Sequence, residues 1–174
     1  LVEYADVIKR IKPFEVNFLT LNYWDDSKKF KPIDNYFNLT NNIKKCIDLI
    51  KDTVKYINVR YTPYCFMKGY EKYVCNQYQH IYDIYDWNKE FYTHAGVNET
   101  IDITKKYSNK EKIDMAYEAA CNDRLQDYKK PIKCIRCKYF NICDGIEKPI
   151  NSDVYPEPGE KINDVNYFRK DFYK

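Results

Sequence analysis

Residues 41–59 read NNIKKCIDLIKDTVKYINV and carry the most regular hydrophobic pattern in the chain. Apolar side chains recur there at steps of three and four, which places them on one face of a helix. Either Thr40 or Asn41 can cap the start of this helix. The pattern predicts a helix that buries one face in a core, and its apolar positions are Ile43, Ile47, Ile50, Val54 and Ile57.

Similar spacing outside this segment predicts further helices. Apolar residues keep the same rhythm over about residues 13–29, and the aromatic stretch 70–92 has a wide apolar face that suits a central helix. Ser108 and Glu111 have the spacing of a capping box, and the helix that they start is predicted to end near Tyr128. Because no segment shows sustained alternation, strands are not expected. The fold class predicted is all-α, a disulfide-stabilised bundle of four to five helices.

Length and composition predict one folded domain. The chain has 174 residues, of which 44% are hydrophobic and 17% aromatic, enough for a single core. Prolines and acidic residues gather after Cys143, which is typical of an extended segment. We therefore expect a helical, cysteine-rich domain over residues 1–145 and an acidic, proline-containing extension over 146–174 that can dock on it.

The charge balance does not indicate a dedicated nucleic-acid binder. The formal net charge of +3 comes from 29 basic and 26 acidic residues mixed along the chain. No apolar run reaches the ~20 residues of a membrane span. A membrane-anchoring segment is therefore expected outside this chain.

The seven cysteines allow three interpretations. Cys134 and Cys137 form a single C-x2-C knuckle, and Cys143 and Cys121 can complete a four-cysteine zinc site, although a second knuckle is missing. A redox dithiol is disfavoured, since no strand is expected before the knuckle. Disulfides in an extracellular domain are the favoured interpretation, with three bridges and one odd thiol. The candidates, whose pairing the sequence does not fix, are Cys46, Cys65, Cys75, Cys121, Cys134, Cys137 and Cys143.

Nothing in the sequence predicts catalysis or a bound cofactor. His80 and His94 lie on the predicted aromatic helix, and three scattered serines give no nucleophile with a base in reach. The glycines are isolated, so no phosphate-binding loop is present. Two sequons, at Asn38 and Asn98, lie in predicted loops and suit a secreted protein.

Three features together resemble a known family. They are LTLNYWDD at 19–26, the spacing from Cys46 to the Cys65–Cys75 segment, and the aromatic helix at 70–92. They resemble the ectodomain of the Plasmodium interspersed repeat proteins, the PIR or VIR group, and next to it the cysteine-rich domain of the SURFIN group. The resemblance covers roughly residues 15–140. The CIRCKYFNIC cluster at 134–143 is denser than the family's core implies.

The resemblance implies a membrane-anchored variant surface antigen of a malaria parasite. Such a module lies on the extracellular face of the parasite or infected red-cell membrane, where it serves immune evasion and adhesion, with no catalysis. Its partner would be a host cell-surface protein or an antibody, with no nucleic acid and no membrane contact except through a span outside this chain. The contact surface is expected in the loop at 58–63 or in the basic and aromatic stretch before Cys143. Candidate contact residues are Arg60, Tyr61, Tyr64, Lys129, Lys130, Arg136 and Tyr139.

One alternative stays open at this point. An intracellular helical module with zinc on four cysteines would use the basic stretch and its aromatic residues to bind RNA or protein. Strong salt dependence of RNA binding would favour that alternative, because phosphate contacts release counterions.

Overall fold

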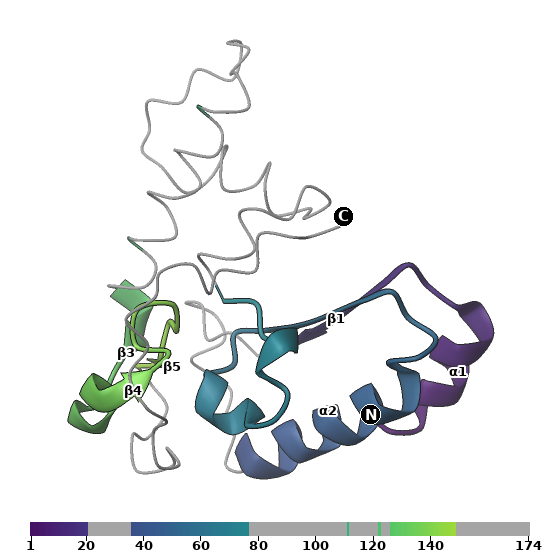
Figure 1. Cartoon of the computed structure of the whole chain (residues 1–174), viewed down its shortest axis with the longest axis horizontal. Helices are drawn as coiled ribbons and strands as arrows, with labels where there is room; N and C mark the ends of the chain where they lie inside the picture. Colours follow the sequence, from purple (N-terminus) through teal and green to yellow (C-terminus); the bar gives the residue numbers. More distant parts are fainter. Residues whose placement is uncertain (21–35, 77–110, 112–121, 123–125, 149–174) are drawn as a thin grey trace, which may run out of the picture.

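The computed structural model describes residues 1–20, 36–76, 111, 122 and 126–148. This part of the chain combines helices with short strands (Figure 1). The α-helices are α1 (Tyr4–Ile11) and α2 (Tyr36–Ile50). The strands are β1 (Glu15–Leu19), β2 (Tyr56–Arg60), β3 (Tyr128–Lys129), β4 (Cys137–Lys138) and β5 (Ile146–Glu147), and the 3-10 helices are η2 (Tyr64–Met67), η3 (Glu71–Tyr73) and η4 (Ile132–Arg136).

A parallel strand pair with a crossover helix organises the first part of the chain. β1 and β2 run parallel, with a register from Glu15 opposite Tyr56 to Leu19 opposite Arg60. Parallel neighbours need a long connection, which commonly holds a helix, and α2 lies in that connection. The unit is therefore β1–α2–β2, with α2 packed along the sheet (Figure 1).

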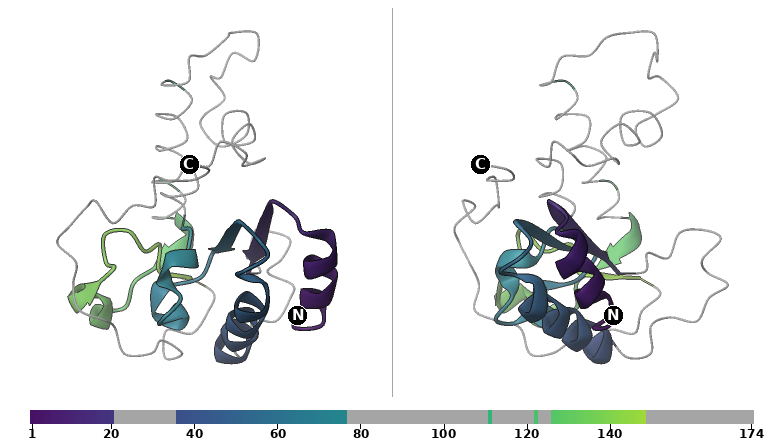
Figure 2. Two further views of the ribbon diagram at one scale, coloured as in Figure 1. Left: turned by 45° about the vertical axis from the view of Figure 1, so that its right-hand side comes forward. Right: turned by 90° about the vertical axis from the view of Figure 1, so that its right-hand side faces the viewer.

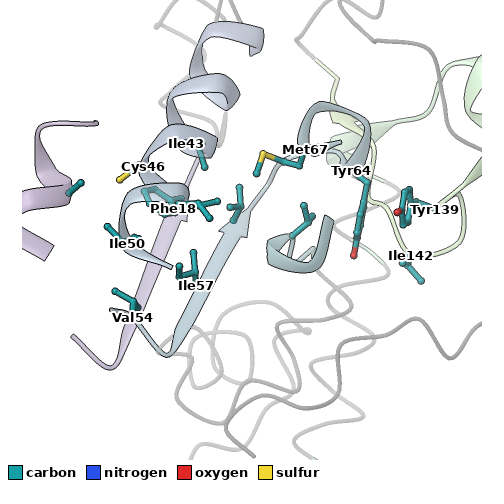
Figure 3. Close-up of a cluster of buried hydrophobic side chains, with 14 of the residues drawn as sticks. Phe18, Ile43, Cys46, Ile50, Val54, Ile57, Tyr64, Met67, Tyr139 and Ile142 are labelled. Carbon is teal, nitrogen blue, oxygen red and sulfur yellow. The ribbon is translucent and has the colours of Figure 1, made fainter. Parts of the chain in front are cut away.

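The apolar face of α2 forms the core with the strands. Ile43, Ile47 and Ile50 are each at most 2% exposed, and they share one cluster with Phe18 and Val59 of the strands. Figure 3 shows Ile43, Ile50 and Phe18 between α2 and the strand pair. Because adjacent strand residues point to opposite faces, only alternate positions of β1 and β2 can face α2. The helix predicted from this periodicity is confirmed as far as Ile50, but its predicted continuation is wrong, because Val54 follows the helix and Ile57 lies in β2.

Helix α1 extends the same helical layer. Ala5 is 1% exposed and belongs to the core cluster that α2 forms, so α1 packs beside α2 (Figure 2). The helix ends at Lys12, which adopts a left-handed conformation with φ of 49° and donates its N–H to the carbonyl of Ile8. That C-terminal turn leads the chain into β1.

The segment 126–148 packs against the end of this unit. Its strands β3 and β5 pair antiparallel, and η4 and β4 lie between them in sequence. Tyr139 stacks on Tyr64 of η2 with ring centroids 4.5 Å apart, and Ile142 joins the same core cluster. Figure 3 shows both rings beside Ile142. Two segments far apart in sequence thus share one core.

The predicted all-α bundle is wrong. The sequence predicted a helix over 13–29, whereas Glu15–Leu19 is strand β1, and residues 21–29 lie outside the described part. The stretch EVNFL is too short for its spacing to separate a helix from a strand, and pairing with β2 decides for the strand. Since β2 is buried along its whole length, it shows no alternation that would reveal it.

Other predicted helix limits are corrected as well. α2 begins at Tyr36, so Thr40 is no cap: its hydroxyl donates to the carbonyl of Tyr36 within the helix. The predicted helix over 70–92 begins instead with η3, and Val74 then bridges to Val59 of β2. Residues 77–92, most of the helix predicted over 108–128, and residues 149–174 of the predicted extension lie outside the described part.

Candidate functional site

Cys65 is held by the turn that follows β2. Tyr61 there has a φ of 58°, a left-handed conformation that is uncommon for a residue with a side chain. The hydroxyl of Thr20 donates to the Tyr61 carbonyl at 2.8 Å, and the Tyr36 hydroxyl donates to the same carbonyl at 3.0 Å. These bonds fix the path of the chain into η2, which carries Cys65.

Three further cysteines lie in one compact stretch of the second segment. Cys134 lies in η4 and donates its N–H to the carbonyl of Pro131, while Cys137 begins β4. The carbonyl of Tyr139 then accepts the N–H of Cys143 at 2.8 Å, which closes a tight turn. Backbone hydrogen bonds therefore fold the CIRCKYFNIC stretch so that its thiols lie near one another.

The packing brings Cys65 to these three cysteines. Cys65 and Cys134 pack against the same small apolar cluster, which contains Phe66 and Ile146. The backbone N–H groups of Tyr64 and Gly145 both hydrogen-bond to the thiol of Cys143, so this sulfur lies beside η2. Each of the three thiols of the stretch also acts electrostatically on Cys65. Cys65 thus lies within electrostatic range of Cys134, Cys137 and Cys143, and these four residues are called the four-thiol site below.

Burial gives the four-thiol site an unfavourable environment for bare negative charge. Desolvation raises the pKa of Cys65 far above its ordinary value, and the neighbouring thiols raise it further. Burial likewise raises the pKa of Cys143 to about 11 and raises that of Cys134. These raised pKa values favour the protonated thiol at Cys65, Cys134 and Cys143, whereas a bound metal would favour the thiolate.

The described cysteines form no disulfide. Cys46, Cys65, Cys75, Cys134, Cys137 and Cys143 are all free thiols, so the predicted disulfide framework is wrong for the part of the chain that the structure describes. Cys46 is 0% exposed on the core face of α2, and Cys75 is 1% exposed after the Val74 bridge. Both behave as small apolar core residues, a common role of free cysteine. Cys121 lies outside the described residues.

A single metal ion does not fit the present side-chain positions. Among the described residues, no group of three or more Cys, His, Asp or Glu side chains converges closely enough to hold one ion. The zinc alternative drawn from the sequence combined Cys121 with the three cysteines of CIRCKYFNIC. The structure instead places Cys65 with them, and no local spacing in the sequence points to that residue.

The candidate contact residues fall into two classes. Arg60, Tyr64 and Tyr139 are at most 5% exposed, and Tyr61 is half-buried. The second class reaches the surface: Lys129 and Lys130 are partly exposed, and Arg136 is exposed. The Nζ of Lys130 donates to the carbonyl of Phe140 at 2.6 Å and lies over the ring of that residue. Whether this set forms a contact surface stays a prediction.

The predicted sequons have different placements. Asn38 lies on the exposed side of α2, within the helix and not in the predicted loop. Asn98 and the two histidines, His80 and His94, lie outside the described residues. Their predicted roles therefore stay predictions.

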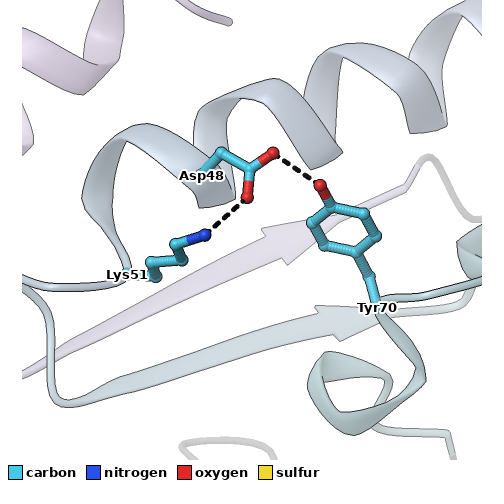
Figure 4. A network of polar contacts seen from close by, with 3 residues as sticks. All are labelled: Asp48, Lys51 and Tyr70. Atoms are coloured by element: carbon cyan, nitrogen blue, oxygen red, sulfur yellow. Dashed lines mark hydrogen bonds and ion pairs between the residues drawn. The ribbon is translucent and has the colours of Figure 1, made fainter.

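A second polar feature lies on the outer side of α2. A shallow pocket of about 450 Å³ is lined by residues of α2 and of the stretch around η3. On its wall Asp48 accepts hydrogen bonds from the Tyr70 hydroxyl and from the ammonium of Lys51 (Figure 4). The Tyr70 bond, followed by the Lys51 bond, lowers the pKa of Asp48. Because these groups already hydrogen-bond to one another, the pocket indicates a ligand or a reaction less clearly than the four-thiol site does.

Comparison with known proteins assigns this chain to no family. No protein-family model matches the chain, and neither the curated proteins nor the solved structures contain a significant match. Within the described residues, neither α1 nor α2 has the length and apolar character needed to span a membrane. The function is therefore argued from the four-thiol site.

Proposed function

We propose that this chain carries an iron–sulfur cluster on Cys65, Cys134, Cys137 and Cys143. The observation that carries the proposal is that four free thiols come from two distant segments, and the three of 134–143 lie near enough to Cys65 to raise its pKa. Cysteine thiolates in sets of four are the usual ligands of such clusters. Three of the four ligands come from the C-x2-C-x5-C stretch 134–143 and one from η2.

Zinc would need a closer convergence of thiols than the described residues show. A zinc ion needs all four sulfurs about 2.3 Å from one point. No described group converges in that way, although the thiols of Cys134, Cys137 and Cys143 lie close enough to Cys65 to raise its pKa. A cluster spreads its ligands over several iron atoms and its own sulfides, so the cysteines need not meet at a point.

The surroundings suit an electron-carrying role. Hydrogen bonds to the ligand sulfur, burial and net charge set the reduction potential of a cluster. The N–H groups of Tyr64 and Gly145 supply hydrogen bonds to Cys143, and the stacked rings of Tyr64 and Tyr139 pack beside it. The proposed function is therefore that of an α/β module that accepts and passes on one electron at a time.

The test is anaerobic reconstitution of the full chain with ferrous iron and sulfide. We expect visible iron–thiolate absorption together with stoichiometric iron and acid-labile sulfide. Cys65→Ala should abolish all three signals, and Cys75→Ala, at a buried thiol outside the four-thiol site, should keep them. Loss of the signals in both variants, or none in the unmodified chain, would reject the proposal.

A zinc assay on the same sample tests the alternative that the cysteines hold zinc. One equivalent of tightly bound zinc with no labile sulfide would favour the four-cysteine zinc module instead. The surface-antigen role inferred from the resemblance stays a prediction, and its all-helical, disulfide-bonded scaffold is not part of the described structure.

A further inference from the structure

Helix α1 exposes an apolar stripe at one end of the described part of the chain (Figure 1). Tyr4 and Ile11 are 67% and 68% exposed, and Val7 between them is 36% exposed. Steps of three and four residues place these side chains on one face of the helix. The helix packs on α2 through another face, where Ala5 is buried and Ile8 is partly buried in the core cluster. Helix α1 therefore turns one apolar face to the core and leaves a second one exposed.

Charges of opposite sign lie at the two ends of this stripe. Glu3 precedes the first turn of α1 and Arg10 lies in its last turn, and both are exposed. They are about two helical turns apart in sequence, so they lie on the same side of the stripe. Asp6 adds negative charge to the first turn, and Lys9 adds positive charge to the last. One end of the helix is therefore acidic and the other end basic.

We propose that α1 pairs with α1 of a second copy of this chain, antiparallel about a two-fold axis near Val7. In this pairing Tyr4 of each copy lies against Ile11 of the other, and the two Val7 side chains meet at the centre. Glu3 of each copy lies beside Arg10 of the other, because a two-fold axis makes every contact twice. Acidic and basic ends thus meet, and such complementary charges fix the partner and its orientation.

A lipid surface is the less favoured occupant of this face. Helices that lie on membranes are rich in Lys and Arg, which anionic lipids attract. Helix α1 begins with Glu3 and Asp6, so an anionic surface would attract one end of the helix and repel the other. A second copy of the chain accommodates both ends at once.

The size of the exposed face sets the expected strength of the dimer. A stable interface commonly buries about 800 Å² on each partner, and one helix of eight residues offers less. We therefore expect a reversible dimer that forms at micromolar or higher chain concentration and dissociates on dilution. The inference does not rest on the proposed cluster, because the four thiols lie in other elements than α1.

Sedimentation equilibrium of the full chain measures this association, in a reducing buffer without added iron or sulfide. Ile11→Ser should weaken the dimer at least about tenfold, since the lost side chain takes part in two symmetry-related contacts. Ile132→Ser is the matched control, because Ile132 is 85% exposed on η4, away from α1 in Figure 1. It should change the association less than about twofold. A monomer at every concentration, or a dimer that Ile11→Ser leaves intact, would overturn the inference.

Charge exchange tests the antiparallel arrangement. Glu3→Arg alone and Arg10→Glu alone each bring like charges together across the interface, so each should weaken self-association at least about threefold at low salt. An equimolar mixture of the two variants should recover the affinity of the unmodified chain, because opposite charges then meet at both contacts. An effect of these charges on the helix dipole acts within one chain and gives no such recovery. A mixture that associates as weakly as either variant alone would overturn the pairing.

Vesicles that contain phosphatidylserine test the lipid alternative. If the chain stays monomeric and its binding to these vesicles is lost in Ile11→Ser, the face binds lipid and the inference is wrong. Failure of iron and sulfide to reconstitute a cluster, with the dimer present, would reject the proposed function alone.

Discussion

The ring of Tyr64 stacks on the ring of Tyr139, with centroids 4.5 Å apart and planes 12° from parallel. Both rings are at most 5% exposed, and they come from the two segments that supply the four-thiol site. This contact therefore joins η2 to the turn between Cys137 and Cys143. Its loss should separate the cysteines as well as weaken the core.

Tyr139→Ala tests this coupling. Removal of a buried ring commonly costs about 3–5 kcal/mol of unfolding free energy, through lost burial and a cavity. We expect a loss of that size in denaturant unfolding and reduced iron incorporation on reconstitution. Tyr139→Phe, which keeps the ring, should retain the iron content of the unmodified chain. Full iron content in Tyr139→Ala would show that the stack does not hold the site together.

Gly145→Ala tests the close approach of the turn after Cys143 to β3. Gly145 has a φ of +99°, and a Cβ there would overlap the carbonyl oxygen of Lys129. Left-handed strain and overpacking should together lower the free energy of unfolding by about 3 kcal/mol or more. Gly69→Ala is the matched control, since Gly69 has a φ of +84° with nothing within 4 Å of the added atom. Gly69→Ala should lower the free energy of unfolding by only about 1–2 kcal/mol. Equal losses in the two variants would show that the contact with Lys129 does not matter.

Ile47→Ala tests the packing of α2 on the sheet. Ile47 is 0% exposed, so its truncation leaves a cavity and should cost about 2–5 kcal/mol in urea unfolding. Leu49 is in the same helix and 43% exposed, and Leu49→Ala should change stability by no more than about 0.5 kcal/mol. A small effect at Ile47 would contradict the core described for α2.

Tyr70→Phe tests the polar contact on the outer side of α2. The Tyr70 hydroxyl is the largest cause of the lowered pKa of Asp48, so its removal should raise that pKa toward the ordinary value. A lowered folded-state pKa stabilises the fold above the unfolded pKa, and this contribution is lost as pH falls through the folded pKa. In the variant, the free energy of unfolding should therefore decrease less as the pH falls through the acidic range. An NMR titration of the Asp48 carboxyl measures the shift, and Lys51→Met should raise the pKa less.

The sequence predicts the core-facing residues of α2 but not the strand pair against which they pack. The apolar positions from Ile43 to Ile50 identify the helix, because a long amphipathic pattern has one interpretation. The strand Tyr56–Arg60 continued that spacing by chance through Ile57, and burial on both faces removed the alternation that marks a strand. Its state is decided by pairing with Glu15–Leu19, a long-range contact that local propensity does not contain.

The sequence likewise pointed to only part of the candidate site. The knuckle at Cys134 and Cys137 allowed a zinc site with Cys143 and Cys121, but disulfides were the favoured interpretation. Cys65 looked like a disulfide candidate, because nothing near it in sequence differs from the settings of Cys46 or Cys75. Only the folding of η2 against the second segment brings Cys65 near the cysteines of 134–143.

The parallel pairing of β1 with β2 also constrains the order in which the chain can fold. Thr20 and the carbonyl that it contacts on Tyr61 are 41 positions apart, so the strand ends meet only after a long loop has closed. Contacts of such high sequence separation slow folding, whereas the hydrogen bonds within α2 are local and form quickly. We therefore expect α2 to be present before the strands pair and the four-thiol site to assemble last, which would make loading of the proposed cluster a late step in maturation.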